Sequence, residues 1–298
     1  MRQSLPRISV ITPSYNQGPY LERTILSVLD QNYPNLQYLI FDGGSTDNSV
    51  EIIKKYSHRL NYWVSSPDSG QASAINAGLE RCDGDIVAYI NSDDWYAHDS
   101  FATVERHFTE NPEVKWLIGT CSYQSTQFRR LLKGRVPLDP ARWVGEGLWL
   151  PQASSFWSKE IFETIGHFRT DMHFSFDLEF GVRALFAGYR PHFIQAVLAN
   201  RWLHENCKTV ALPENFHLEL DRFIEIFGHH LTEQKLEDAK SLVLRRYLQY
   251  YIEQDKFRDA AIVFLNLLRR HPRSALAFCK SAFIRRFKLK GPHNSPWH

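Results

Sequence analysis

Residues 86–94 have the sequence IVAYINSDD, in which five apolar residues lead into four polar ones. Residues 38–44, YLIFDGG, follow the same pattern, with an aspartate and two glycines after the apolar run. Apolar runs of this length that alternate with helical stretches are typical of buried parallel strands. Ligands of open α/β sheets bind outside the carboxyl ends of the strands, and carboxylates placed there can hold a divalent cation on a phosphate. The sequence therefore predicts a ligand site at one edge of a sheet.

The first hundred residues repeat the order strand, loop, helix, which predicts an α/β fold. Right-handed crossovers then give a three-layer α/β/α arrangement around a mostly parallel sheet. The segment 121–157 is rich in aromatic residues, Gly and Pro and is expected to form loops around a pocket. Strands are expected at 8–12, 38–42, 62–64, 85–90 and 114–118, and helices over 71–81 and 176–187.

The length of 298 residues suggests one large domain with an appended part. Helical periodicity dominates from residue 214 onward, which places a boundary near the segment 211–213. We expect a catalytic-type α/β domain over residues 1–212 and an α-helical region over 213–298. The segment 283–290, FIRRFKLK, can lie on an anionic membrane surface or can pack as a helix with a solvated basic face.

The composition of the chain bears on its binding partners, the state of its cysteines and its location. The formal net charge of +2 gives no general attraction for nucleic acid, so no nucleic-acid partner is expected. The four cysteines show neither metal nor disulfide spacing, and we expect them to be reduced thiols. The sequence contains no recognisable signal peptide and no apolar run of membrane-spanning length. The expected location is the cytoplasm, with peripheral contact at the inner face of the membrane.

Four short motifs together resemble family 2 glycosyltransferases with the GT-A fold. They occur in the family's order, and the resemblance covers roughly residues 6–210. It implies a nucleoside-diphosphate-sugar donor, a divalent metal and transfer with inversion. The motifs are ITPSYN (11–16), DGGSTD (42–47), DSGQ (68–71) followed by NAG (76–78), and NSDD (91–94).

The resemblance also assigns donor contacts. Asp42 would accept a hydrogen bond from the base, at a uracil N–H in the UDP case; alternatively, it caps the following glycines as a turn former. Thr12, Pro13 and Tyr15 would form the wall around the base and ribose. Further donor-binding positions are Asp68, Gln71, Asn91, Ser92 and Lys208.

The metal-binding triplet departs from the family pattern, because Asn91 stands where the first aspartate is usual. Asp93 then becomes the principal ligand of Mg²⁺ or Mn²⁺, and one acid suffices because magnesium takes one or two carboxylates together with waters and substrate phosphates. By analogy, His204 reaches the metal or the diphosphate. Asp94 is expected to point away and support the site.

A base must remove the proton of the acceptor hydroxyl. Asp177 and Glu179 both lie on the helix expected over 176–187, but two residues apart, so they do not share a face. Glu179 can pair with Arg183 in a solvated i,i+4 salt bridge. Small residues on the stripe of Asp177 leave room beside it, which favours Asp177 as the base.

The segment before this helix is expected to contact the acceptor, a glycan or a lipid-linked molecule, through Trp149, Gln152 and Trp157; a tryptophan is equally suited to the core. The sequence as a whole indicates an inverting, metal-dependent glycosyltransferase in surface polysaccharide or glycan assembly. Two alternatives stay open: a nucleotidyltransferase, and a non-catalytic nucleotide-sugar-binding or scaffold protein.

Overall fold

The computed structural model describes residues 5–148, 150–205, 207–208 and 213–288. The chain forms two compact units. The first contains Met1–Val136 and Trp149–Leu212, and the second contains Pro137–Leu148 and Pro213–His298. The short segment 137–148 therefore belongs to the helical unit, whereas the sequence placed it within the domain 1–212.

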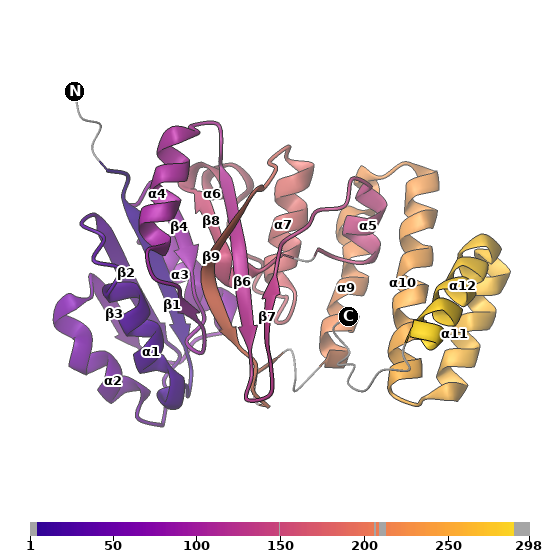
Figure 1. The fold of residues 1–298 in the computed structure, drawn as a ribbon, viewed down its shortest axis with the longest axis horizontal. Coiled ribbons are helices and arrows are strands. Elements are labelled where there is room, and N and C mark those ends of the chain that lie inside the picture. Colours follow the sequence, from indigo (N-terminus) through magenta and orange to yellow (C-terminus); the bar gives the residue numbers. More distant parts are fainter. Residues whose placement is uncertain (1–4, 149, 206, 209–212, 289–298) are drawn as a thin grey trace. The chain divides into compact units, whose positions relative to one another are not determined.

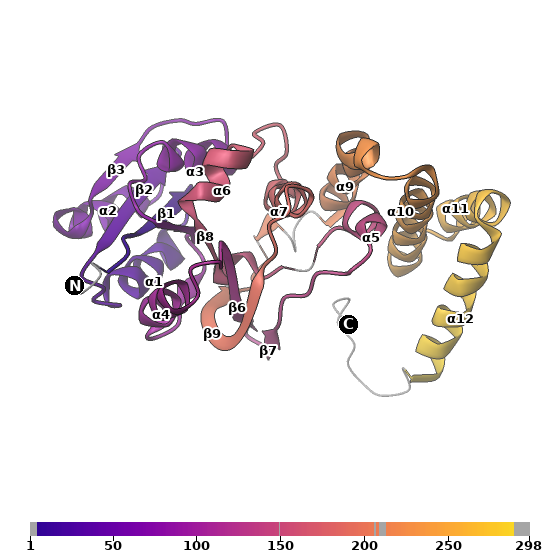
Figure 2. The same cartoon turned by 90° about the horizontal axis from the view of Figure 1, so that it is seen from above.

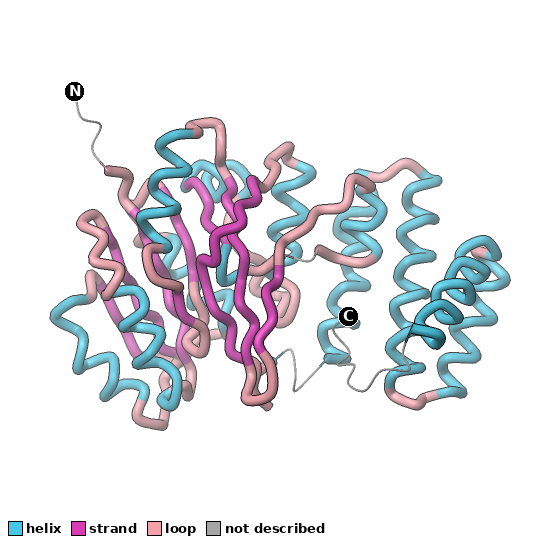
Figure 3. The backbone as a smooth tube through the Cα atoms, in the orientation of Figure 1, coloured by secondary structure: helices cyan, strands magenta, loops and turns pink. Residues whose placement is uncertain are grey.

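One mixed sheet forms the centre of the first unit (Figures 1 and 3). Its strand order is β3-β2-β1-β4-β8-β6-β9-β5, with β7 paired to β6. Within the described part of the chain the strands are β1 Ile8–Ser14, β2 Leu36–Asp42, β3 Tyr62–Ser65, β4 Ile86–Tyr89, β5 Trp95–Tyr96, β6 Trp116–Gln124, β7 Arg129–Leu132, β8 Ser155–Ser158 and β9 His192–Trp202.

The first four strands in sequence, β1 to β4, pair in parallel, as predicted. Ser14 lies opposite Asp42, and Asp42 lies opposite Ser65, so three strands end at the same level. Tyr89, the last residue of β4, lies opposite Ile11 of β1. The carboxyl ends of these strands thus form the common edge at which the sequence predicted a ligand site.

The second half of the sheet differs from the prediction. The strand expected at 114–118 begins at Trp116 and continues to Gln124. The segment 121–157, expected to form loops, also contributes β7 and β8. Strand β8 pairs antiparallel with both β4 and β6, whereas β9 runs parallel to β6. The fold class is nevertheless the predicted one, α/β with helices on both faces of the sheet.

Helices cover both faces of the sheet, α1 and α4 on one side and α3 and α6 on the other (Figure 2). The core between these layers is apolar, and Leu21, Ile25 and Val28 of α1 are fully buried in it. The described helices of this unit are α1 Gly18–Leu29, α2 Ser49–Tyr56, α3 Gln71–Leu79, α4 Ser100–Glu110, α6 Lys159–Ile165 and α7 Phe176–Phe186, with 3₁₀ turns η1 Ser57–Arg59 and η2 Gln152–Ser154.

The second unit is helical, as predicted for the end of the chain. Helix α10 is the longest of the described helices of this unit and runs from Glu233 to Glu253. Helix α5 contacts α9 and α10, and α10, α11 and α12 share a small apolar core. The described helices are α5 Pro140–Gly145, α9 Pro213–Phe227, α10 Glu233–Glu253, α11 Phe257–Arg270 and α12 Pro272–Lys288, with the turn η3 Gly228–His230.

The segment 283–290 falls mostly within α12, whose backbone is helical to Lys288. Its side chains, and residues 289 and 290 altogether, lie outside the described part of the structure. The membrane-surface expectation for this segment therefore stays a prediction. No helix of the described residues is long and apolar enough to cross a membrane.

Candidate active site

Asp42 closes β2 and orders the loop that follows. Its carboxylate is buried and accepts hydrogen bonds from Gly44 N (3.2 Å), Ser45 N (2.9 Å), Ser45 Oγ (2.5 Å) and Ser65 Oγ (2.7 Å). Three of these donors share Oδ2 and one reaches Oδ1, so most of the hydrogen-bonding capacity of Asp42 is used within the protein, while Oδ1 can still accept a further hydrogen bond. The turn-forming alternative accounts for the contacts of Asp42, and its contact to a base stays a prediction.

The three residues expected to form the base and ribose wall lie in different surroundings. The Thr12 side chain is fully buried, and its hydroxyl lies 3.0 Å from the Tyr38 hydroxyl. Pro13 is also buried, while Tyr15 is exposed. Of the three, only Tyr15 has an exposed side chain, and the role of all three as donor contacts stays a prediction.

A chain of side-chain hydrogen bonds joins three of the predicted donor-binding residues. Gln71 Nε2 donates to Asn91 Oδ1 (2.7 Å), and Lys208 Nζ donates to Gln71 Oε1 (3.1 Å). Gln71 is the first residue of α3, whose N-cap is Gly70 with φ of 107°. Asp68 Oδ1 accepts from Gly70 N (2.7 Å) and shapes this helix start. The N-terminus of α3, which favours anions, thus lies beside the ammonium group of Lys208.

The two predicted metal ligands are in direct contact. His204 Nε2 lies 3.1 Å from Asp93 Oδ2, and both side chains are largely buried. The imidazole packs against the ring of Tyr20 of α1, with a centroid separation of 4.6 Å and a tilt of 35° between the rings. Within the described residues, the buried Nδ1 atom of His204 has no hydrogen-bond partner. Residues 111 positions apart in the sequence are therefore brought to one point.

The separation in this pair is that of a hydrogen bond, and it is also compatible with two neighbouring ligands of one metal ion. Adjacent ligands of an octahedral Mg²⁺ ion, each about 2.0–2.1 Å from the metal, lie about 2.9 Å apart. The separation of Asp93 Oδ2 and His204 Nε2 is close to that value. Among the described residues, no group of three or more His, Cys, Asp or Glu side chains is arranged to hold a metal ion. A cation here would need substrate phosphates and waters to complete its coordination.

Asp94 connects the loop after β4 to the end of β9, beside the contact between Asp93 and His204. Its buried carboxylate accepts a hydrogen bond from Trp202 N (3.0 Å), which connects the end of β9 to the residues that follow β4. Burial and the neighbouring Asp93 raise the pKa of Asp94, and the positive charge of Arg201 opposes the rise. Because His204 follows Trp202 by two residues, Asp94 helps to set the distance between His204 and Asp93.

Helix α1 supports the same loop with two residues that the sequence analysis did not identify. Thr24 Oγ1 lies within hydrogen-bonding distance of the carbonyl oxygens of Ser92 (2.9 Å) and Asp94 (2.6 Å), which share its single proton. Arg23 donates to the carbonyl oxygen of Asp93 (3.2 Å), and its guanidinium lies 3.5 Å from the centre of the Trp95 ring. The Ser92 side chain is buried, and the contact with Thr24 is made by the main-chain carbonyl oxygen of Ser92.

Asp177 lies near the end of β4, in the first turn of α7. Burial, and after it the charge of Asp177, raise the pKa of Tyr89, the last residue of that strand. Gln152 Nε2 donates to the carbonyl oxygen of Tyr89 (2.9 Å). The predicted base and one predicted acceptor residue therefore both approach the strand that leads to Asn91.

Glu179 has the structural role that the spacing favoured, but its environment differs from the prediction. It pairs with Arg183 through two hydrogen bonds of 3.0 and 2.9 Å. The Glu179 side chain is only 1% exposed and that of Arg183 is 25% exposed, so the carboxylate is buried and the ion pair is only partly solvated. Arg183 also donates to the carbonyl oxygens of Ile165 and His167, which joins α7 to the end of α6.

One of the two tryptophans assigned to the acceptor, Trp157, is part of the core of the first unit. Trp157, on β8, is buried and packs against Tyr89, Phe162 and Phe180. This placement favours the core alternative, because a buried ring offers no face to a sugar. Trp149 lies outside the described residues.

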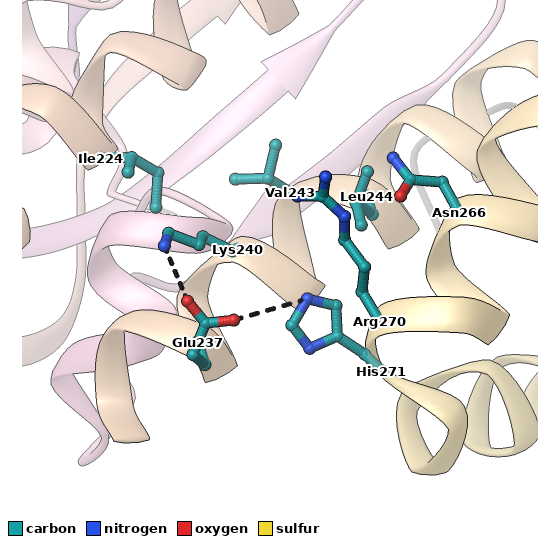
Figure 4. A pocket seen from close by; sticks show the side chains of 8 residues that line it. All are labelled: Ile224, Glu237, Lys240, Val243, Leu244, Asn266, Arg270 and His271. Carbon is teal, nitrogen blue, oxygen red and sulfur yellow. Dashed lines mark hydrogen bonds and ion pairs between the residues drawn. The ribbon is translucent and has the colours of Figure 1, made fainter. Parts of the chain in front are cut away.

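The helical unit has a cavity of its own, of about 240 Å³ (Figure 4). Residues of α9, α10 and α11 line it, and Glu237 there pairs with Lys240 at 2.7 Å and faces His271 at 3.9 Å. None of the predicted site residues lines this cavity. Its acidic group is already paired, and it adds nothing to the site of the first unit.

The fold and the clustered motif residues identify a family. The family model of glycosyl transferase family 2 matches residues 9–175, which is more than half of the chain. The chain belongs to that family, and its fold is of the GT-A type, as the sequence predicted.

Similar proteins include the putative teichuronic acid biosynthesis glycosyltransferase TuaG of Bacillus subtilis, 34% identical over 137 residues, or 45% of this chain and 51% of TuaG. S. aureus TarS 1-349 in complex with UDP-GlcNAc has a TM-score of 0.63 and 17% identity, over 91% of this chain and 83% of that one. The mannosyltransferase PcManGT from Pyrobaculum calidifontis, in complex with GDP-Man and Mn²⁺, has a TM-score of 0.53 and 17% identity, over 98% and 77%. The matched stretches cover about half or less of the first curated relatives.

Proposed function

We propose that this chain is an inverting, metal-dependent glycosyltransferase that moves a sugar from a nucleoside-diphosphate sugar, UDP-linked, to an acceptor hydroxyl. The observation that carries this proposal is the contact of Asp93 with His204. It stands beside the hydrogen bonds that join Asn91 to Gln71 and Gln71 to Lys208. Family membership supports the reaction class. The UDP-GlcNAc in the TarS complex supports the donor class, and the Mn²⁺ in the PcManGT complex supports the use of a divalent cation.

In the proposed reaction, the acceptor oxygen attacks the anomeric carbon while the bond from that carbon to the diphosphate oxygen breaks. Asp177 takes the proton of the attacking hydroxyl. Lys208 and the N-terminus of α3 face the departing diphosphate and stabilise its negative charge. A single displacement of this kind inverts the anomeric centre.

Asp93 and His204 would hold Mg²⁺ or Mn²⁺, with Asn91 as a neutral neighbour. When bound, the cation would offset the charge that develops on the leaving diphosphate. His204 is kept in position by the Tyr20 ring, and Asp93 by the contacts of its main chain with Arg23. The protein therefore supplies a fixed pair of ligands and leaves the remaining coordination to the donor.

The acceptor is proposed to be a glycan or a lipid-linked molecule in surface polysaccharide assembly, at the cytoplasmic face of the membrane. The teichuronic acid role in the name of TuaG supports this assignment. Gln152 stays a proposed acceptor contact, because it lies near Asp177 at the end of β4.

A thermal-shift series with UDP, GDP, dTDP, CDP and their sugars, each with and without Mn²⁺, tests the donor site. A ligand that binds the native state raises the melting temperature by mass action. We expect a metal-dependent shift with uridine nucleotides that is lost in Asp93→Ala and retained in Asp83→Ala, a surface carboxylate of the same unit. If no nucleotide shifts the melting temperature, the transferase proposal fails and the scaffold alternative takes its place.

A further inference from the structure

Helix α11 of the helical unit buries only one of its faces. Ala260 and Leu267 are buried in the small core that α11 shares with α10 and α12. At 100° per residue, the opposite face runs through residues 258, 262, 265 and 269. A helix that needs apolar residues only for packing would carry polar side chains there.

Large apolar side chains nevertheless occupy that outer face and its margin. The exposed fractions are 65% for Phe257, 58% for Ile262, 63% for Leu265 and 43% for Leu268. Arg258 and Arg269, both exposed, lie at the two ends of the stripe that contains Ile262 and Leu265. Adjacent exposed apolar residues bordered by polar ones mark interaction surfaces more often than isolated ones do. We call Phe257, Arg258, Ile262, Leu265, Leu268 and Arg269 the outer face of α11.

The positive charge of α11 and α12 indicates what kind of partner the outer face of α11 can bind. Residues 257–288, which form α11 and α12, contain eight Arg or Lys residues and one Asp, a net charge of +7. The whole chain has a net charge of only +2. A partner for the outer face must therefore offer apolar contact and negative charge together.

We propose that the outer face of α11 docks on the surface of an anionic lipid bilayer. A second copy of the chain would place one segment of charge +7 against another, which opposes self-association. A nucleic acid would attract the arginines but would give Ile262 and Leu265 no apolar environment. Anionic headgroups above acyl chains satisfy both groups of side chains, because arginines extend to the headgroups while the apolar side chains enter below them.

The dimensions of α11 suit a helix that lies in the plane of the membrane. Its 14 residues extend about 21 Å, which is shorter than the hydrocarbon core of about 30 Å. Its buried side stays packed in the helical unit, so docking requires no unfolding. The inference does not depend on the donor site, because none of the residues that carry it belongs to that site.

Co-sedimentation of the full chain with vesicles of phosphatidylcholine, with and without phosphatidylglycerol, tests the proposal. We expect binding to the anionic vesicles that weakens as salt is added. The Ile262→Ser/Leu265→Ser variant should bind about tenfold more weakly. Arg258→Gln/Arg269→Gln should lose about fivefold per charge, because each basic residue near an anionic surface contributes about 1 kcal/mol.

Two matched controls separate this surface from general effects. Leu218→Ser removes an exposed leucine from α9 of the same unit, and Lys54→Gln/Arg106→Gln removes two exposed charges from the first unit. Both variants should bind vesicles like the wild type. The proposal is wrong if the wild type stays in the supernatant with anionic vesicles, or if the α11 variants bind as well as the controls. It is equally wrong if the α11 substitutions abolish a dimer detected by light scattering and leave vesicle binding unchanged.

Discussion

Asp177 and Glu179 are two residues apart on α7, yet their surroundings give them different roles. Glu179 is buried against Arg183, which leaves it no means of meeting an acceptor. Asp177 is half-buried beside Tyr89. We therefore expect Asp177→Asn to lower kcat by about 10²–10⁴, since a general base contributes that much. The uridine-nucleotide thermal shift should be unchanged, because the substitution removes the base and not the donor contacts.

Glu179→Gln is the matched control for that experiment. It removes a buried charge from a paired arginine, so it should cost about 1–3 kcal/mol of stability. Its kcat should stay within a few-fold of the wild type at a temperature where the variant is folded. The assignment of the base is reversed if Glu179→Gln abolishes transfer and Asp177→Asn does not.

Asp94 provides a second prediction about a single residue. Its hydrogen bond to Trp202 N holds the segment that carries His204 against Asp93. Asp94→Ala should weaken Mn²⁺ binding by about 10–100-fold in the presence of UDP, as expected when a residue that orients a metal ligand is lost. Asp94→Asn keeps an acceptor for Trp202 N and should recover part of the affinity. Isothermal titration with Mn²⁺ distinguishes the two variants, and equal affinity in Asp94→Ala and wild type would contradict the positioning role.

The site could be predicted from sequence where a motif marked it, or where the family resemblance pointed to a position, as for His204 and Lys208. Gln71, Asn91 and Asp93 stand in short motifs at strand and helix ends, so their convergence could be expected. Thr24 and Arg23 stand in an ordinary amphipathic helix, and nothing in the local sequence indicates that they bind the main chain of the Asn91–Asp94 loop. Contacts of this kind depend on how α1 packs on the sheet, which short-range patterns do not contain.

At the scale of elements, the position of α3 matters because its first residue, Gln71, connects Asn91 to Lys208. Gly78 on this helix lies against β1, and a Cβ there would come within 2.7 Å of Ile11 Cγ2. An exposed helical Gly→Ala change gains about 1 kcal/mol. We expect Gly78→Ala instead to cost about 1–3 kcal/mol, since overpacking outweighs that gain.

Urea unfolding of Gly78→Ala in the wild-type and Ile11→Ala backgrounds measures this effect. The cost of Gly78→Ala should shrink when Ile11 is shortened, because the two changes act on one contact. A cost that is the same in both backgrounds would show that the close approach to Ile11 is not its cause.

Elements differed in how far the sequence could predict them. Strands β1, β2 and β4 are apolar runs that end in polar residues, and β3 is a short aromatic run between helical stretches. Strand β9 has exposed residues over most of its first half and no regular alternation. Strand β8 is only four residues long and follows a 3₁₀ turn. Such strands are stabilised by pairing with distant partners, and that information is absent from their own sequences.

For the whole molecule, the notable feature is that the chain passes between its two units three times. Residues 137–148 leave the sheet unit and return to it, and the chain leaves it again after Leu212. The composition of 137–148 resembles that of its neighbours, so no compositional change marks a boundary there. The assignment of 1–212 as a self-contained domain therefore stays a prediction that truncation can test.

The packing of helix α5 predicts that a chain truncated after Leu212 will self-associate. Its residues Ala141, Trp143 and Val144 are buried, and the helix contacts α9 and α10. Arg246 of α10 donates to the carbonyl oxygen of Gly145 (2.9 Å), and Lys235 pairs with Asp139 at 2.8 Å. A chain cut after Leu212 would keep α5 but lose everything that covers it, so we expect it to self-associate through the exposed apolar residues.

Size-exclusion chromatography with light scattering measures this self-association. Trp143→Ser/Val144→Ser should restore a monodisperse monomer in the truncated chain, because it removes the uncovered side chains. The same pair in the full chain should destabilise the helical unit by about 3–5 kcal/mol, since there both side chains fill its core. A truncated chain that is monomeric without these substitutions would show that α5 does not need α9 and α10. Opposite effects of one substitution pair in the two chains would establish that a segment inside the sequence of the sheet unit belongs physically to the helical one.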